Sequence, residues 1–134
     1  MSFLHAPGPR FNRVCRVLLP GVLLLVLIAA LIDAPEALDY GLGDKMMHLL
    51  TFFMLGLLSE SAYPRSPPLW RLASALLAYG LLIECLQYLL PWREFSMLDW
   101  AADGAGLLLW LLIGWPLRRS ALAESYRDKL AVSG

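Results

Sequence analysis

Acidic and basic side chains recur at helical spacings near the ends of long apolar runs, where they could bind a ligand or move a proton. Asp44 and His48 are one helical turn apart, and so are Asp99 and Asp103, so each pair is expected to share one helix face. Lys45 lies beside the first pair. Carboxylates with an imidazole suit general acid or base catalysis, and cationic groups suit binding of a phosphate or carboxylate.

Glu84 is the most informative of these residues because it lies inside an apolar run. It is about six residues from the end of that run, roughly 9 Å deep at a rise of about 1.5 Å per residue. An ionisable group at such a depth is costly and normally faces a helix-bundle interior or a wet cavity. We expect His48 or Lys45 to be its partner. Gln87 follows on the same stripe, and Arg93 lies in the next loop.

The composition places these residues in a membrane. Of the 134 residues, 59% are hydrophobic and 16% are charged. Soluble domains usually carry about 25% charged residues, and a short soluble chain has little interior in which to bury so much apolar surface. Lipid must therefore take the place of a core, and the length allows one domain.

Four apolar runs predict an all-α fold, a membrane-embedded antiparallel four-helix bundle with short loops. Only helices or closed barrels satisfy every backbone group in lipid, and these runs are too long and too uniformly apolar for barrel strands. After the last run, Leu122, Tyr126 and Leu130 recur every fourth residue, which indicates a short amphipathic helix on the membrane surface. The runs cover residues 17–32, 46–63, 69–90 and 98–117.

The distribution of Lys and Arg predicts the orientation. Nine of the eleven lie in the N-terminal segment, the second connection or the tail, so both termini are expected in the cytoplasm. The exceptions, Lys45 and Arg93, lie on the outer face beside acidic residues, which favours pairing or ligand binding there. The predicted segments are a cytoplasmic N-terminal segment at 1–16, a four-span membrane domain at 17–117 and a cytoplasmic amphipathic tail at 118–134.

These polar residues resemble the VanZ-like family of integral membrane proteins. The family pattern is Asp-Lys-x-x-His, then Glu-x-x-Gln, a Pro and an Arg, an Asp, and a final Asn and Gly. Here the chain reads DKMMHLLTFFMLGLL from Asp44 and ECLQYLLPWREFSMLDWAADGAG from Glu84. Asp103 departs from the pattern, since the family often has Asn there, and its carboxylate adds charge to the cluster. The matching residues are Asp44, Lys45, His48, Glu84, Gln87, Arg93, Asp99 and Gly104.

The resemblance implies a multi-pass protein of the bacterial inner membrane, and it suggests a link to resistance to the glycopeptide teicoplanin. The leading hypothesis is a non-transport envelope protein with a polar pocket on its outer face. That pocket would bind the head group of a membrane lipid or lipid-linked glycan, for example one carried on polyprenyl phosphate, with Arg93 and Lys45 on the phosphate or carboxylate. The expected ligand-binding residues are Asp44, Lys45, His48, Glu84, Gln87, Arg93, Asp99 and Asp103.

Two alternatives stay open on the sequence. In an enzyme acting on such a lipid, His48 or Glu84 would be the general base or acid. In a structural subunit of an envelope complex or a homo-oligomer, the polar groups would only hold helices together, and Asp44 and Asp99 would cap helix N-termini.

Neither a cofactor nor a metal is predicted, because no nucleotide fingerprint or metal-ligand spacing occurs. A divalent ion held by the acidic residues and His48 is the weaker alternative. Nucleic acid is not expected as a partner.

Overall fold

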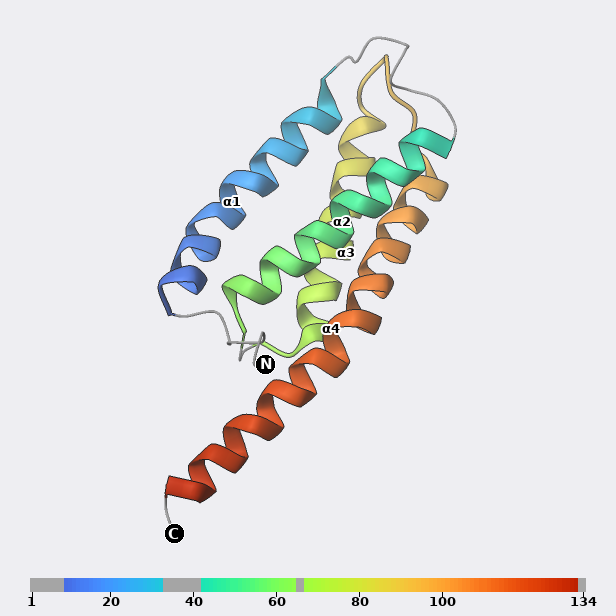
Figure 1. Cartoon of the computed structure of the whole chain (residues 1–134). Helices are drawn as coiled ribbons and strands as arrows, with labels where there is room; N and C mark the ends of the chain where they lie inside the picture. The colour runs from blue at the N-terminus through green and yellow to red at the C-terminus, as the bar shows by residue number, and fades with distance from the viewer. Residues whose placement is uncertain (1–8, 33–41, 65–66, 133–134) are drawn as a thin grey trace.

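Four helices make up the described part of the chain. The computed structural model describes residues 9–32, 42–64 and 67–132, and no side chain beyond residue 114 is described. The helices are α1 (Pro9–Leu31), α2 (Leu42–Ala62), α3 (Leu69–Gln87) and α4 (Met97–Val132), and no strand occurs among the described residues. Each helix runs antiparallel to the one before it (Figure 1). The predicted all-α four-helix bundle is confirmed.

Three of these helices are long and apolar enough to cross a membrane: α1, α3 and the first part of α4, Met97–Gly114. The chain is thus a membrane protein. α2 has the length of a span but is less apolar, since it carries Asp44, Lys45, His48 and Glu60. It also packs against all three of the other helices. Its polar side chains therefore have protein neighbours, and the helix needs less apolar surface to lie in the bundle.

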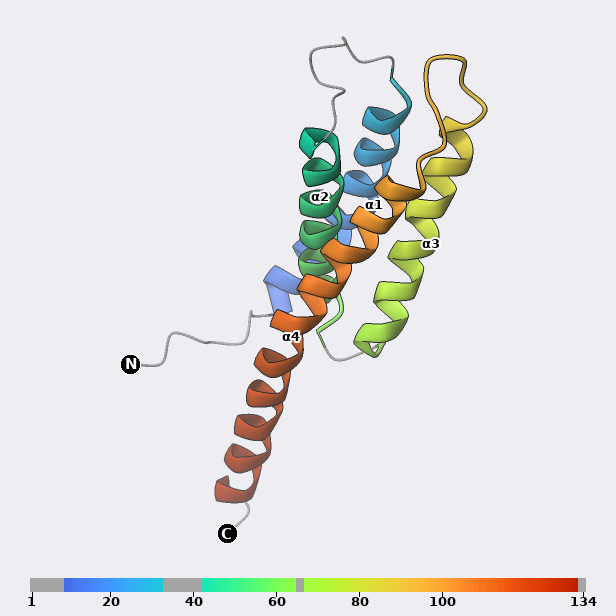
Figure 2. The same ribbon diagram turned by 90° about the vertical axis from the view of Figure 1, so that its right-hand side faces the viewer.

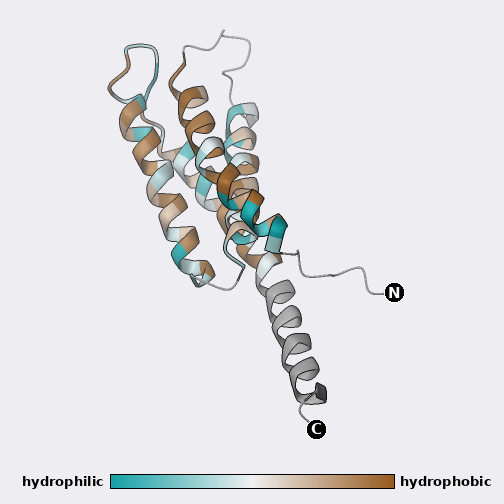
Figure 3. Cartoon of the chain, turned by 90° about the vertical axis from the view of Figure 1, so that its left-hand side faces the viewer, coloured by the Kyte–Doolittle hydropathy of each residue, from teal (hydrophilic) through white to brown (hydrophobic). Residues whose placement is uncertain are grey.

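α1 lies at the edge of the bundle, against α2 and α3. Of its residues, only Cys15 is buried, and Figure 3 shows it apolar along most of its length and polar at its N-terminal end. Arg16 ties this end to α2, because its guanidinium donates two hydrogen bonds, of 3.3 and 3.1 Å, to the Ala62 carbonyl. The guanidinium also lies over the ring of Tyr63, 5.0 Å from its centroid. An apolar helix so little covered by protein is suited to contact with lipid.

α4 continues without a break well beyond the other three helices (Figure 2). The sequence predicts a separate amphipathic helix for the tail, and the tail is indeed helical, but it extends the fourth helix. The stripe of Leu122, Tyr126 and Leu130 falls among side chains that are not described. The surface position of the tail and the boundaries at 16 and 117 stay predictions.

Small residues let α2 and α4 pack closely. A Cβ added at Gly106 would collide with the backbone carbonyl of Leu49, and one added at Gly56 would lie 2.5 Å from the ring of Trp110. Trp110 is fully buried, and its ring N–H donates a 2.9 Å hydrogen bond to Glu60. Close backbone approach at glycines is the usual way in which membrane helices gain packing contacts.

α2 and α4 both begin at the same end of the bundle, and α1 and α3 end there (Figure 1). We call this the polar end. Because α2 and α4 run in the same direction, one helical turn along the first corresponds to one turn along the second.

Replacing Gly106 by Ala is expected to lower the free energy of unfolding by about 1–3 kcal/mol, because a methyl group would meet the rigid Leu49 backbone. Reversible unfolding in mixed micelles measures this change. Gly104→Ala is the matched control, since its Cβ would lie at 3.7 Å from Leu77, an ordinary contact. The two substitutions raise helix propensity equally, so equal stabilities would contradict the close α2–α4 approach.

Candidate functional site

The polar end holds all eight residues that the sequence selects as ligand-binding. They come from three helices and one connection, so residues distant in the chain meet at one depth, as the helical spacings predict. α2 contributes Asp44, Lys45 and His48; α3 contributes Glu84 and Gln87; the connection 88–96 contributes Arg93; α4 contributes Asp99 and Asp103.

Two polar pairs join α2 to α4. Lys45 Nζ lies 3.1 Å from Asp99 Oδ1, and one turn deeper His48 Nδ1 lies 2.8 Å from Asp103 Oδ1. Because α2 and α4 run in the same direction, the residue one turn deeper on α2 pairs with the residue one turn deeper on α4. Asp103 is almost completely buried, with 1% of its surface exposed. Burial of a carboxylate is tolerated when a hydrogen-bonded partner satisfies it, and His48 has that role.

Gly80 on α3 makes room for the buried Asp103 carboxylate. A Cβ at Gly80 would lie 2.5 Å from Asp103 Oδ2 and 3.1 Å from the Phe52 ring. The sequence gives no signal for this contact, because spacing does not reveal which side chain approaches a glycine.

Glu84 is fully buried and binds the backbone at the start of α4. Its Oε2 accepts a 2.8 Å hydrogen bond from the backbone N–H of Ser96, the residue just before α4. The expected pairing of Glu84 with His48 or Lys45 is wrong, since both of those bind aspartates of α4. The reason is the rotation of α2, which turns both side chains toward α4 rather than α3.

Ser96 caps α4, a role that the sequence analysis considers only for acidic residues. The Ser96 hydroxyl accepts a hydrogen bond of 3.2 Å from the backbone N–H of Asp99. In a capping box, the side chain of the third helical residue accepts a hydrogen bond from the backbone N–H of the cap residue. Asp99 is the third residue of α4, but its side chain binds Lys45. The Ser96 N–H donates to Glu84 of α3 instead. Asp99 therefore does not cap the helix. The Ser-x-x-Asp spacing before an apolar run was the signal that could have identified Ser96.

Three side chains satisfy the last carbonyls of α1, which have no partner within the helix. Gln87 Nε2 donates to Ala30 at 3.0 Å, Trp92 Nε1 donates to Leu31 at 3.3 Å, and Arg93 Nη2 donates to Ile32 at 3.4 Å. A cation at a helix C-terminus also interacts favourably with the helix dipole. Gln87 and Arg93 thus hold the bundle together at the same place where a ligand would meet them.

Two adjoining pockets open between these side chains. The first, of about 330 Å³, is polar and includes Ser96, Trp92, Glu94 and Asp99 in its lining. The second, of about 190 Å³, reaches between α1, α2 and α3 past Val26, Ala29, Phe52 and Ile83. Of the eight residues expected to bind a ligand, Lys45, Glu84 and Asp103 line neither pocket. Four residues line both pockets: Asp44, His48, Gln87 and Arg93.

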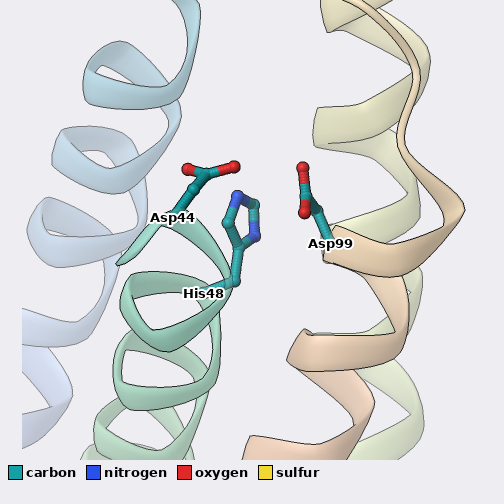
Figure 4. Close-up of side chains that lie close together, drawn as sticks. All are labelled: Asp44, His48 and Asp99. Atoms are coloured by element: carbon teal, nitrogen blue, oxygen red, sulfur yellow. The ribbon is translucent and has the colours of Figure 1, made fainter. Parts of the chain in front are cut away.

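Asp44, His48 and Asp99 come together at the mouth of the polar pocket. Each offers one ligand atom, and these atoms lie within 4.8 Å of one another. Figure 4 shows the His48 ring between the two carboxylates, which come from different helices. The arrangement can hold a cation or orient an imidazole toward a bound molecule.

A comparison with protein-family models matches residues 18–118 to the family described as VanZ/LLP1. The matched range contains α2, α3 and every residue of the polar end described above. Neither a curated protein nor a solved structure matches the chain.

Replacing Glu84 by Ala is expected to lower the free energy of unfolding by about 2–4 kcal/mol, because a buried N–H loses its acceptor and a cavity forms. Glu84→Gln is the control, since its amide oxygen can still accept the Ser96 bond, and its cost is expected to stay below about 1 kcal/mol. Unfolding in mixed micelles measures both. Equal losses for the two variants would mean that the charge of Glu84, and not this hydrogen bond, stabilises the bundle.

Proposed function

Because the chain belongs to the VanZ/LLP1 family, we propose that it is an envelope membrane protein whose polar pocket binds the head group of a lipid or lipid-linked glycan. The observation that carries this proposal is that the polar pocket shares four residues with a second pocket, called the apolar pocket below, whose remaining lining residues are all apolar except Thr51. A ligand that fills both must be polar at one end and apolar at the other. Membrane lipids have that chemistry.

The apolar pocket fits the start of a hydrocarbon chain. Val26 and Ala29 of α1 and Ile83 of α3 are among its lining residues, and α1 is the least buried of the three helices that could span the membrane. A chain that leaves the head group between α1 and α2 would pass directly into the bilayer. This arrangement supports a ligand drawn from the membrane and not from solution.

Arg93 is placed to contact an anionic group on the ligand, whereas Lys45, the other contact expected from the sequence, lines neither pocket. Arg93 lines both pockets, and a guanidinium forms paired hydrogen bonds with phosphate or carboxylate oxygens. Lys45 is held at the same depth by Asp99. Gln87, His48 and Asp44 would bind hydroxyl or amide groups of a glycan.

The polar end would face outward from the bacterial inner membrane, with both termini in the cytoplasm. Arg10, Arg13 and Arg16 of α1 and Arg71 of α3 lie at the opposite end of the bundle. Cytoplasmic ends of membrane helices carry an excess of Lys and Arg. A role in resistance to teicoplanin is suggested by the family resemblance alone, and sensitivity of a deletion strain to this glycopeptide tests it.

A second candidate is an enzyme acting on a lipid-linked phosphate or glycan, and the His48–Asp103 pair favours it. A buried carboxylate that holds one imidazole nitrogen leaves the other free to act as a general base. In this candidate His48 takes the proton, while Glu84 acts only through its position. Turnover of a polyprenyl-phosphate-linked substrate that stops in a folded His48→Gln variant would establish it.

Ala29→Phe is expected to lower the amount of co-purified lipid about tenfold, because the ring would fill the apolar pocket and exclude about two methylene groups. Mass spectrometry of lipids extracted with the purified protein gives this ratio. Ile28→Phe is the matched control: it enlarges the neighbouring residue, which is exposed and lines neither pocket. Unchanged lipid in Ala29→Phe, or the same loss in Ile28→Phe, would refute binding in this pocket.

A further inference from the structure

The polar end carries more negative than positive charge. Among the described residues it holds five carboxyl side chains but only two permanently charged cations, Lys45 and Arg93. Excess charge that is partly removed from water is costly unless an ion of opposite sign accompanies it. An anionic head group alone would add to the excess. The five carboxyl groups belong to Asp44, Glu84, Glu94, Asp99 and Asp103.

Two of these carboxylates and the His48 imidazole are arranged as ligands for one ion. Asp44 and His48 share a face of α2, Asp99 approaches from α4, and their ligand atoms lie within 4.8 Å of one another. The pair with Lys45 uses Oδ1 of Asp99, and a carboxylate has a second oxygen to offer. Small side-chain rotations would bring the three atoms to a common cation.

His48 is held as metal-bound histidines are held. Its Nδ1 lies 2.8 Å from Asp103 Oδ1; when the neutral imidazole donates its proton from Nδ1 to that carboxylate, Nε2 has its lone pair for a ligand. Asp103 is 1% exposed and packs over Gly80, so it cannot turn away. A buried carboxylate behind an imidazole fixes the ring orientation and raises its basicity.

Glu84 provides a second, independent observation. It is fully buried, yet its Oε1 has no hydrogen-bond partner among the described residues. A buried carboxylate oxygen without a donor is unfavourable. A cation held by His48 and Asp99 would stabilise it without a direct bond.

We propose that Asp44, His48 and Asp99 bind one divalent transition-metal ion at the mouth of the polar pocket. One imidazole and two carboxylates suit Zn²⁺ or Mn²⁺ better than the all-oxygen sites of Mg²⁺ or Ca²⁺. Three protein ligands leave coordination positions open, and a phosphate or carboxylate oxygen of the head group takes one of them. The ion site rests on these side chains alone, whereas the identity of the outer ligand rests on the proposed function.

Calorimetric titration of the chelator-treated full-length protein with ZnCl₂, in nanodiscs of a neutral phospholipid, tests the site. Wild type is expected to bind one ion per chain. Asp44→Asn and His48→Gln are expected to weaken binding by at least about 100-fold, and Asp103→Asn by about 10–100-fold, because it only positions the imidazole. Unfolding midpoints in chelator that equal that of wild type would show that the variants are folded. If Asp44→Asn fails to fold, the zinc affinity of Asp103→Asn tests the site in its place.

Glu94→Gln is the matched control, because Glu94 lines the same pocket but is outside the three-ligand group. It is expected to bind zinc as wild type does. Absence of a bound ion in wild type, or equal weakening by Glu94→Gln and Asp44→Asn, would overturn the proposal and indicate a diffuse acidic surface.

Lipid retention in chelator and in ZnCl₂ separates this proposal from the proposed function. Zinc binding without lipid retention would leave the ion site intact and refute the head-group pocket. Lipid retention without zinc binding would support the head-group pocket and refute the ion site. Retention that rises with zinc in wild type, but not in Asp44→Asn, is the expected result.

Discussion

Close packing of α2 against α4, which run in the same direction, decides where the polar residues of this bundle meet. Gly106 leaves no space between its helix and the Leu49 carbonyl, so the two backbones are held at contact. At that distance Lys45 reaches Asp99, and one turn deeper His48 reaches Asp103. A shift of one helix by a single residue would rotate each partner by about 100° and separate both pairs.

The polar end also satisfies helix ends that lipid would leave without partners. Glu84 accepts a backbone N–H at the start of α4, and the side chains of Gln87, Trp92 and Arg93 donate to the last carbonyls of α1. An unpaired backbone group in hydrocarbon costs several kcal/mol. Gln87, Trp92 and Arg93 therefore stabilise the fold and also line a pocket, so a loss of function after their substitution needs a stability measurement beside it.

Charge explains why the site differs from a simple phosphate pocket. Lys45 pairs with Asp99 and lines neither pocket, and Arg93, which donates to the Ile32 carbonyl, shares the lining of the polar pocket with several carboxylates. A metal ion bound by carboxylates and an imidazole would turn a repulsive surface into an attractive one. The Asp at 103, where the resemblance leads one to expect Asn, strengthens the hold on His48 by adding a charged acceptor.

Local sequence patterns were enough to predict the four helices of the bundle and the end at which the polar residues gather, but not that the tail continues the fourth helix. Apolar runs and one-turn spacings are local properties, so Asp44 with His48, or Asp99 with Asp103, could be placed on one face without knowing any neighbour. The depth of Glu84 followed from a count along its run. Only the tertiary structure decided the partners: Glu84 binds the Ser96 backbone, His48 and Lys45 turn to α4, and Gly80 accommodates a carboxylate. Those contacts depend on how each helix is rotated and shifted against the others, and side chains from all four helices settle that packing together.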